Sequence, residues 1–188
     1  MKPSDPKGRR AVFLDRDGVL NQAVERDGKP VAPWRAEDFK TIPGAPEAVR
    51  AMRRELGALV IVVTNQPDIE RGTLAPEELD RMHRILRRQI ELDDLVVCPH
   101  KSDGCKCRKP APGMLLTAAA RWKIDLKRSF MIGDRDKDIE AGKRAGCTTI
   151  LIRYPYNTQV KADYTVENLQ EAVSLMARQW EEHHENIR

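Results

Sequence analysis

The sequence has few aromatic residues and no apolar run of membrane-spanning length. Of its 188 residues, 40% are hydrophobic but only 5% are aromatic. A transmembrane helix needs about 20 consecutive apolar residues, and no stretch approaches that length. Nothing resembles the hydrophobic core of a secretory signal either. We therefore expect a cytoplasmic protein that does not interact with membranes.

A strong net charge and a concentrated basic face are also missing. The formal net charge is +4, and basic residues are spread along the chain rather than gathered as in nucleic-acid-binding proteins. The densest basic segment, RMHRILRRQ at 81–89, interleaves apolar residues at helical spacing, which is typical of an amphipathic helix. We expect no nucleic-acid partner, and a monomer whose modest positive charge suits a small anionic substrate.

Cysteine is scarce, but three of the four cysteines lie close together. Cys98, Cys105 and Cys107 fall within ten residues, whereas Cys147 stands apart and is typical of a core residue. Without an export signal, reduced thiols are expected rather than disulfides. Together with His100, the cluster offers three thiolates and an imidazole, the usual ligands of a closed structural Zn²⁺ site. We predict that these four residues bind zinc, with no ligand position left open for catalysis.

Short apolar runs alternate with amphipathic segments along most of the chain. The runs predict strands at 11–15, 59–63, 95–97, 129–132 and 148–152. Helical spacing predicts helices at 46–56, 76–92, 113–122, 136–145 and 167–182. This alternation indicates an α/β fold with one doubly wound, Rossmann-like parallel sheet. We expect a flexible arm at 1–10 and a single domain at 11–188.

Residues 20–43 show no clear period and make up the longest stretch without a predicted element. Long segments of this kind are usually functional lids or hairpins. The chain has no insertion long enough to form a large cap domain. We therefore expect that only this segment folds over a site at the edge of the sheet.

Polar residues follow the predicted strands. Asp15 and Asp17 follow the first strand, Thr64-Asn65-Gln66 the second, and the acid-rich segment 133–138 the fourth, while Arg108 and Lys109 precede a helix. Ligands bind beyond the carboxyl ends of strands in open α/β sheets, where these residues would meet. Carboxylates suit Mg²⁺, and a hydroxyl, an amide and a lysine suit phosphate oxygens. The combination predicts phosphoryl-transfer chemistry, in which one carboxylate can act as nucleophile.

Four motifs, FLDRDG, VVTNQ, CRKP and MIGDRDKD, occur in the order found in the haloacid dehalogenase (HAD) superfamily of aspartate-nucleophile phosphatases. The chain resembles this superfamily over nearly its whole length. The resemblance implies that Asp15 attacks phosphorus and forms an aspartyl-phosphate. It implies that Asp17 protonates the leaving alcohol and then takes a proton from water. Thr64 and Lys109 would bind the transferring phosphoryl group.

The same resemblance implies a Mg²⁺ cofactor. Its implied ligands are Asp15, the main-chain carbonyl of Asp17, and Asp134. Asp138, the second acid of the last motif, would have a supporting role. A different hypothesis is a zinc-bearing binding module with a decayed phosphatase site, but the intact Asp15, Asp17, Lys109 and Asp134 argue against it.

The predicted zinc loop, residues 98–107, resembles a loop found in a narrower group of HAD phosphatases. Asn21 and the segment PGML at 112–115 are also similar to residues of that group. That group contains the D-glycero-D-manno-heptose 1,7-bisphosphate phosphatases and the histidinol-phosphate phosphatases. It implies substrate contacts from Asn65, Arg71, Arg108 and Lys109.

The leading hypothesis is hydrolysis of the C7 phosphate of the heptose bisphosphate, a small sugar phosphate. Histidinol phosphate is the alternative substrate, because the short zinc loop is nearer to that of the histidinol-phosphate phosphatases. Residues 67, 68 and 70 are also larger than those usual in the heptose enzymes.

Overall fold

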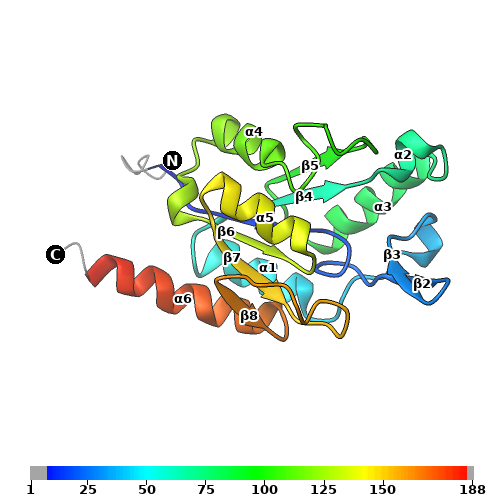
Figure 1. Cartoon of the computed structure of the whole chain (residues 1–188). Helices are drawn as coiled ribbons and strands as arrows, with labels where there is room; N and C mark the ends of the chain where they lie inside the picture. The colour runs from blue at the N-terminus through cyan, green and yellow to red at the C-terminus, as the bar shows by residue number, and fades with distance from the viewer. Residues whose placement is uncertain (1–7, 186–188) are drawn as a thin grey trace.

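A six-stranded parallel sheet forms the centre of the computed structural model, which describes residues 8–185 and the side chains of 8–181 (Figure 1). The strands are β1 (Ala11–Leu14), β4 (Leu59–Asn65), β5 (Asp94–Cys98), β6 (Phe130–Gly133), β7 (Thr148–Ile152) and β8 (Tyr164–Val166). Their order is β5-β4-β1-β6-β7-β8, and every neighbouring pair is parallel. All carboxyl ends therefore lie along one edge of the sheet, where ligands bind in such folds.

Helices cover both faces of this sheet. One face carries α1 (Ala45–Arg54), α3 (Pro76–Gln89) and α6 (Leu169–Glu185); the other carries α4 (Gly113–Trp122) and α5 (Asp136–Ala145). Successive strand residues point to opposite faces of the sheet, so Val12 packs on the side of α1, α3 and α6, and Phe13 packs on the side of α4 and α5. Burying one large apolar side chain contributes about 1.5–3 kcal/mol. The predicted doubly wound α/β fold is confirmed.

All the predicted strands and helices are present, with their ends shifted by a few residues. The structure adds β8 and the short helices α2 (Asp68–Arg71) and η2 (Leu126–Arg128). These elements have three or four residues each, too few to show a hydrophobic period. None of the helices described is long and apolar enough to cross a membrane.

The last residues of the expected arm, Arg9 and Arg10, form hydrogen bonds with the rest of the domain. Residues 1–7 of that arm lie outside the described residues. The Arg9 amide donates to the Lys123 carbonyl (3.0 Å), and the Arg10 guanidinium donates to the Leu56 carbonyl (3.0 Å). Residues 8–10 therefore belong to the packed domain.

The segment 20–43 contains an antiparallel hairpin, β2 (Val24–Arg26) and β3 (Lys29–Val31), followed by the short helix η1 (Ala36–Asp38). Asp27 and Gly28 both have positive φ (51° and 70°), as a two-residue type I′ turn requires. The hairpin lies near α2 at the right-hand end of Figure 1. Trp34 joins the two, because its indole N–H donates to the Asp68 carboxylate at 2.8 Å.

Candidate active site

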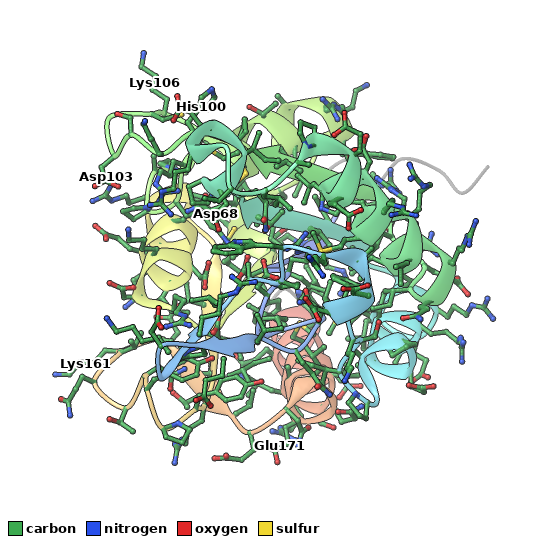
Figure 2. The ribbon with its side chains drawn as sticks, turned by 90° about the vertical axis from the view of Figure 1, so that its right-hand side faces the viewer. Asp68, His100, Asp103, Lys106, Lys161 and Glu171 are labelled. Carbon is green, nitrogen blue, oxygen red and sulfur yellow. The ribbon has the colours of Figure 1, made fainter. Side chains whose placement is uncertain are left out.

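A cavity of about 180 Å³ lies at the carboxyl edge of the sheet. Figure 2 looks at this end of the molecule, with Asp68 of α2 near the middle and His100 of the zinc loop above it. The hairpin segment lines one side of the cavity with small residues, Ala23, Val31 and Ala32. The polar lining includes the predicted site residues Asp15, Asp17, Asn65, Lys109, Asp134 and Asp138. Residues far apart in sequence are thus brought together here.

Lys109 is the central cation of this cavity. Its ammonium group lies 2.7 Å from Asp15 Oδ1 and 2.6 Å from Asp138 Oδ1, and it donates to the Val63 carbonyl at 2.8 Å. The side chain is 2% exposed. Burial alone would lower the pKa of Lys109, but the charges of Asp138 and Asp15 outweigh burial and raise that pKa. Lys109 therefore remains a cation at neutral pH.

Three carboxylates, those of Asp15, Asp134 and Asp138, have oxygen atoms within 4.8 Å of one another. Burial raises the pKa of Asp15 to about 8, with Asp138 and Asp134 adding to the rise and Lys109 opposing it. Burial and Asp138 raise the pKa of Asp134 to about 6. Among the described residues, Asp134 Oδ1 is buried without a hydrogen-bond partner. Clustered acids and an unsatisfied carboxylate oxygen fit a hard divalent cation with oxygen ligands.

Asp134 is oriented by residues that the sequence reasoning missed. The Tyr156 hydroxyl donates to Asp134 Oδ2 at 2.6 Å, and the Asn157 amide donates to the Asp134 carbonyl at 2.8 Å. Gly18 leaves the room this requires, since a Cβ there would lie 2.5 Å from Asp134 Oδ2. The tyrosine and the asparagine lie in the loop after β7, which carries no motif. No sequence pattern pointed to them.

The Asp17 carboxylate is held by a separate set of donors. Arg16 forms an ion pair with it (2.9 Å), and the amides of Asn21 and Gln66 donate to it at 3.0 and 2.8 Å. Burial alone would raise the pKa of Asp17, but the Arg16 charge and these hydrogen bonds outweigh burial and lower it. Asp17 is therefore ionised in this arrangement.

Arg16 itself is fully buried, and the sequence reasoning did not single it out. Its Nη1 donates to His83 Nε2 at 3.2 Å. Burial and the Arg16 charge lower the pKa of His83 to about 4. The imidazole is thus neutral at pH 7 and can accept this hydrogen bond.

The other predicted contact residues have different surroundings. The Asn65 side chain clamps the main chain of Lys109, donating to its carbonyl and accepting from its amide, both at 3.0 Å. Thr64 is buried, and its hydroxyl accepts a hydrogen bond from Gln66 at 2.9 Å. Arg71 lies half-exposed on α2, paired with Asp68.

Arg108 contacts the loop before it rather than the cavity. Its guanidinium donates to the His100 carbonyl at 3.2 Å and to Asp103 at 3.4 Å. The structure therefore brings neither Arg71 nor Arg108 into the lining of the cavity.

The four predicted zinc ligands form one compact cluster. The distances among the Sγ atoms of Cys98, Cys105 and Cys107 and the Nδ1 atom of His100 range from 3.0 to 3.9 Å. Ligands about 2.3 Å from a tetrahedral zinc would lie about 3.8 Å apart, whereas a disulfide requires about 2.05 Å. Hydrogen bonding with Cys107 lowers the pKa of Cys105 to about 6. These four residues have the donor types and the spacing for a zinc ion.

Comparisons with known proteins agree with this geometry. Residues 106–172 match a family described as HAD-hydrolase-like. The chain is 36% identical over 159 residues to a D-glycero-beta-D-manno-heptose-1,7-bisphosphate 7-phosphatase of Rhodopseudomonas palustris, covering 78% of this chain and 84% of that protein. A Photorhabdus laumondii protein named as the alpha-anomer phosphatase is 34% identical over 150 residues, covering 73% and 78%.

Solved structures give the same result. The crystal structure of D,D-heptose 1,7-bisphosphate phosphatase from B. bronchiseptica, complexed with magnesium and phosphate, superposes with a TM-score of 0.76 at 29% identity. The match covers 90% of this chain and 99% of that one.

Proposed function

The chain belongs to the HAD-like phosphatases, in the family of the heptose-1,7-bisphosphate 7-phosphatases, and from this premise we propose that it hydrolyses the C7 phosphate of D-glycero-D-manno-heptose 1,7-bisphosphate. The observation that carries the proposal is the buried cluster of Asp15, Lys109, Asp134 and Asp138 around one cavity. Histidinol phosphate, the alternative substrate, has no support among the relatives described above.

The proposed cofactor is Mg²⁺. Asp15 and Asp134, with the main-chain carbonyl of Asp17, would hold the ion, and it would neutralise charge on the phosphoryl oxygens. The orphaned Asp134 Oδ1 and the raised pKa values of both acids support this assignment, since a cation would stabilise their ionised forms.

Asp15 is the proposed nucleophile. One carboxylate oxygen would attack phosphorus as the bond from phosphorus to the sugar oxygen breaks, leaving an aspartyl-phosphate that water then hydrolyses. Splitting a difficult reaction into two steps in this way is the usual benefit of covalent catalysis. Lys109 contacts an oxygen of Asp15 and would stabilise negative charge on the phosphoryl group during both steps.

Asp17 is the proposed proton carrier. It would give a proton to the leaving sugar oxygen and then accept one from the attacking water. The ion pair with Arg16 favours the ionised form and hence the second role. A phosphate dianion bound nearby would raise the pKa of Asp17, which supplies the protonated form that the first step requires.

Zinc is the proposed structural ion of the loop 98–107. This loop runs directly into Arg108 and Lys109, so fixing it also fixes the chain that carries the catalytic cation. Arg71 and Arg108 remain predicted substrate contacts. Arg71 lies on α2 and Arg108 directly follows the zinc loop, and these two elements lie at the same end of the molecule (Figure 2).

The test is Mg²⁺-dependent phosphate release from both anomers of heptose 1,7-bisphosphate, with histidinol phosphate and a 3′-phosphorylated oligonucleotide for comparison. The heptose bisphosphates should be strongly preferred. Asp15→Asn should abolish turnover, and Asp17→Asn should lower kcat by about 10²–10⁴-fold. Asp125→Asn, a change remote from the cavity, is the matched control. A preference for histidinol phosphate would overturn the substrate, and a fully active Asp15→Asn variant would overturn the mechanism.

A further inference from the structure

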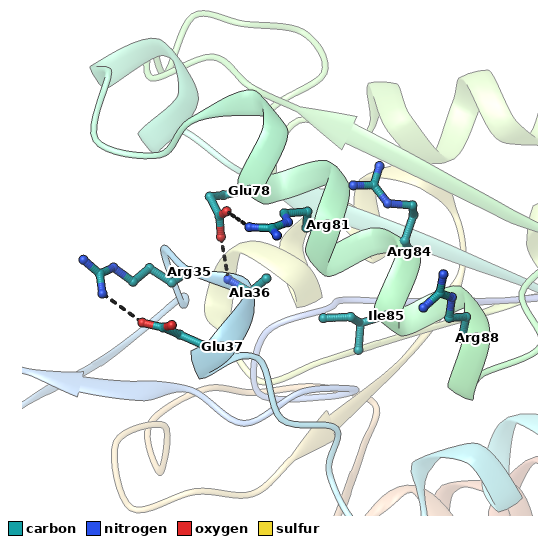
Figure 3. Close-up of a pocket in the computed structure, with 8 residues that line it drawn as sticks. All are labelled: Arg35, Ala36, Glu37, Glu78, Arg81, Arg84, Ile85 and Arg88. Carbon is teal, nitrogen blue, oxygen red and sulfur yellow. Dashed lines mark hydrogen bonds and ion pairs between the residues drawn. The ribbon is translucent and has the colours of Figure 1, made fainter.

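A second hollow lies between η1 and α3 and shares no lining residue with the catalytic cavity (Figure 3). Its volume is about 710 Å³. Four arginines, two glutamates and Ile85 line it, together with Ala36. We call this hollow the arginine groove. Nothing in the proposed phosphatase mechanism uses it.

Both glutamates of the arginine groove are already neutralised. Glu37 pairs with Arg35 at 2.8 Å, and Glu78 pairs with Arg81 at 2.9 Å. In Figure 3 no dashed line reaches Arg84 or Arg88. Within residues 8–181, neither of these two guanidinium groups has an acidic or hydrogen-bonding partner. The groove therefore carries two uncompensated positive charges.

Arg84 and Arg88 lie four residues apart on α3, so their guanidinium groups are neighbours on one face of the helix and repel each other. Several other surface arginines are paired, such as Arg53 with Asp93 and Arg121 with Asp94. A bound anion would relieve the repulsion between Arg84 and Arg88.

We propose that the arginine groove binds a small organic molecule that carries two phosphoryl groups about 10 Å apart. Arg81 and Arg88 are seven positions apart on α3, which is about 10 Å along the helix axis. A phosphoryl group at one end would share the Arg81 guanidinium with Glu78, and one at the other end would pair with the unpartnered Arg88. Guanidinium groups form paired hydrogen bonds with phosphate oxygens. Ile85, between the arginines, offers an apolar contact for the body of such a ligand.

The groove also connects α3 with the segment that covers the catalytic cavity. The Ala36 amide donates to Glu78 at 2.7 Å, and Arg35 lies on the same segment as Ala23 and Val31, which line the cavity. A ligand that bridges Arg35 and the arginines of α3 would hold this segment against the helix. Any effect on turnover rests on the proposed function, whereas binding itself does not.

The test uses octane-1,8-bisphosphonate, whose C–P bonds a phosphatase does not hydrolyse, with methylenebisphosphonate as the short probe. Calorimetry on the full chain loaded with zinc and Mg²⁺ should show binding of the long probe. Arg84→Glu should weaken that binding by about 10-fold or more. Arg87→Glu should leave it within about 2-fold, because Arg87 is on the same helix but outside the groove.

Amide NMR shifts should locate the bound probe, changing at residues 35–37 and 78–88. If Arg84→Glu does not fold, Arg84→Gln and the shift map provide the same test. Absent binding, equal loss in Arg84→Glu and Arg87→Glu, or shifts confined to the catalytic cavity would each overturn the inference. The probe needs no turnover, so failure here would leave the phosphatase proposal standing.

Discussion

Raising the pH from 6.5 to 8 should destabilise the zinc-loaded, Mg²⁺-free wild type relative to its Asp15→Asn variant, because Asp15 loses a proton inside a buried cluster of acids. The pKa of Asp15 is about 8 in the folded state against an ordinary value of 3.8. Within this window the folded protein holds a proton on Asp15 that the unfolded chain lacks. Linkage then makes the contribution of Asp15 to the free energy of unfolding fall as the pH rises, by about 1.4 kcal/mol per pH unit. Over the window this contribution falls by about 1.5–2 kcal/mol.

The comparison with Asp15→Asn is needed because another group titrates in this window with the opposite sign. Cys105 has a lowered pKa of about 6, so it is ionised in the folded protein while the unfolded chain holds its proton, and its contribution makes the free energy of unfolding rise with pH. His83 has a lowered pKa of about 4 against an ordinary value of 6.5, so its contribution makes the free energy of unfolding fall as the pH drops from about 7 towards 4. Asp134, with a raised pKa of about 6, acts in the same direction as Asp15 but has mostly titrated before pH 6.5. Lys109 stays protonated throughout, because its pKa is raised above the ordinary value of 10.5.

Urea unfolding followed by circular dichroism at several pH values measures this slope directly. Asp15→Asn should remove the Asp15 contribution, and saturating Mg²⁺ should do the same in the wild type, since the ion would hold Asp15 ionised. A difference in unfolding free energy between wild type and Asp15→Asn that stays constant from pH 6.5 to 8 without Mg²⁺ would refute the reasoning. So would an equal slope in Asp15→Asn.

Three further predictions concern the proposed zinc and Mg²⁺ sites and Lys109. Chelation of zinc at pH 7 should release one ion per chain and lower both stability and turnover, as atomic absorption and phosphate release would show; unchanged turnover in zinc-free protein would contradict the role of the loop. Tyr156→Phe should raise the half-saturating Mg²⁺ concentration by about 10-fold through loss of the hydrogen bond to Asp134, with kcat at saturating Mg²⁺ little changed. Tyr164→Phe, which removes a hydroxyl that donates to Gln179 rather than to a residue of the cavity, is its control, and equal effects of the two would exclude the specific role. Lys109→Met should lower the free energy of unfolding without Mg²⁺ by about 3–5 kcal/mol, because two buried carboxylates lose their partner; a loss below about 1 kcal/mol would contradict this.

The sheet and its helices could be predicted because their sequence signals are local. The β-branched run 59–63 is typical of a buried strand, and the glycine after Leu56 marks the end of a helix. The zinc cluster was predictable for the same reason, since its ligands lie within ten residues of one another. In both cases the residues that determine the structure lie close together in the sequence.

The residues that hold Asp134 and Arg16 in place could not be found in this way. Tyr156 and His83 reach the site through packing of a loop and a helix, and neither lies in a motif. Arg16 stands inside a motif, but no pattern shows that a residue of its size and charge is fully buried. Arg71 and Arg108 are predicted substrate contacts that lie outside the lining of the cavity. The sequence does not show that the Asp68 carboxylate binds Arg71 or that the His100 carbonyl binds Arg108.

Lys109 shows how the proposed Mg²⁺ site depends on the proposed zinc loop. Strand order explains why Asp15, Asn65 and Asp134 line one cavity, because β1 lies between β4 and β6 and all three strands point the same way. No strand carries Lys109. Its place follows from the zinc loop that precedes it and from the Asn65 side chain that clamps its main chain. In the proposed enzyme a structural zinc ion would therefore affect catalysis without contacting the substrate, since it would fix one end of the segment that places the Lys109 ammonium group against Asp15.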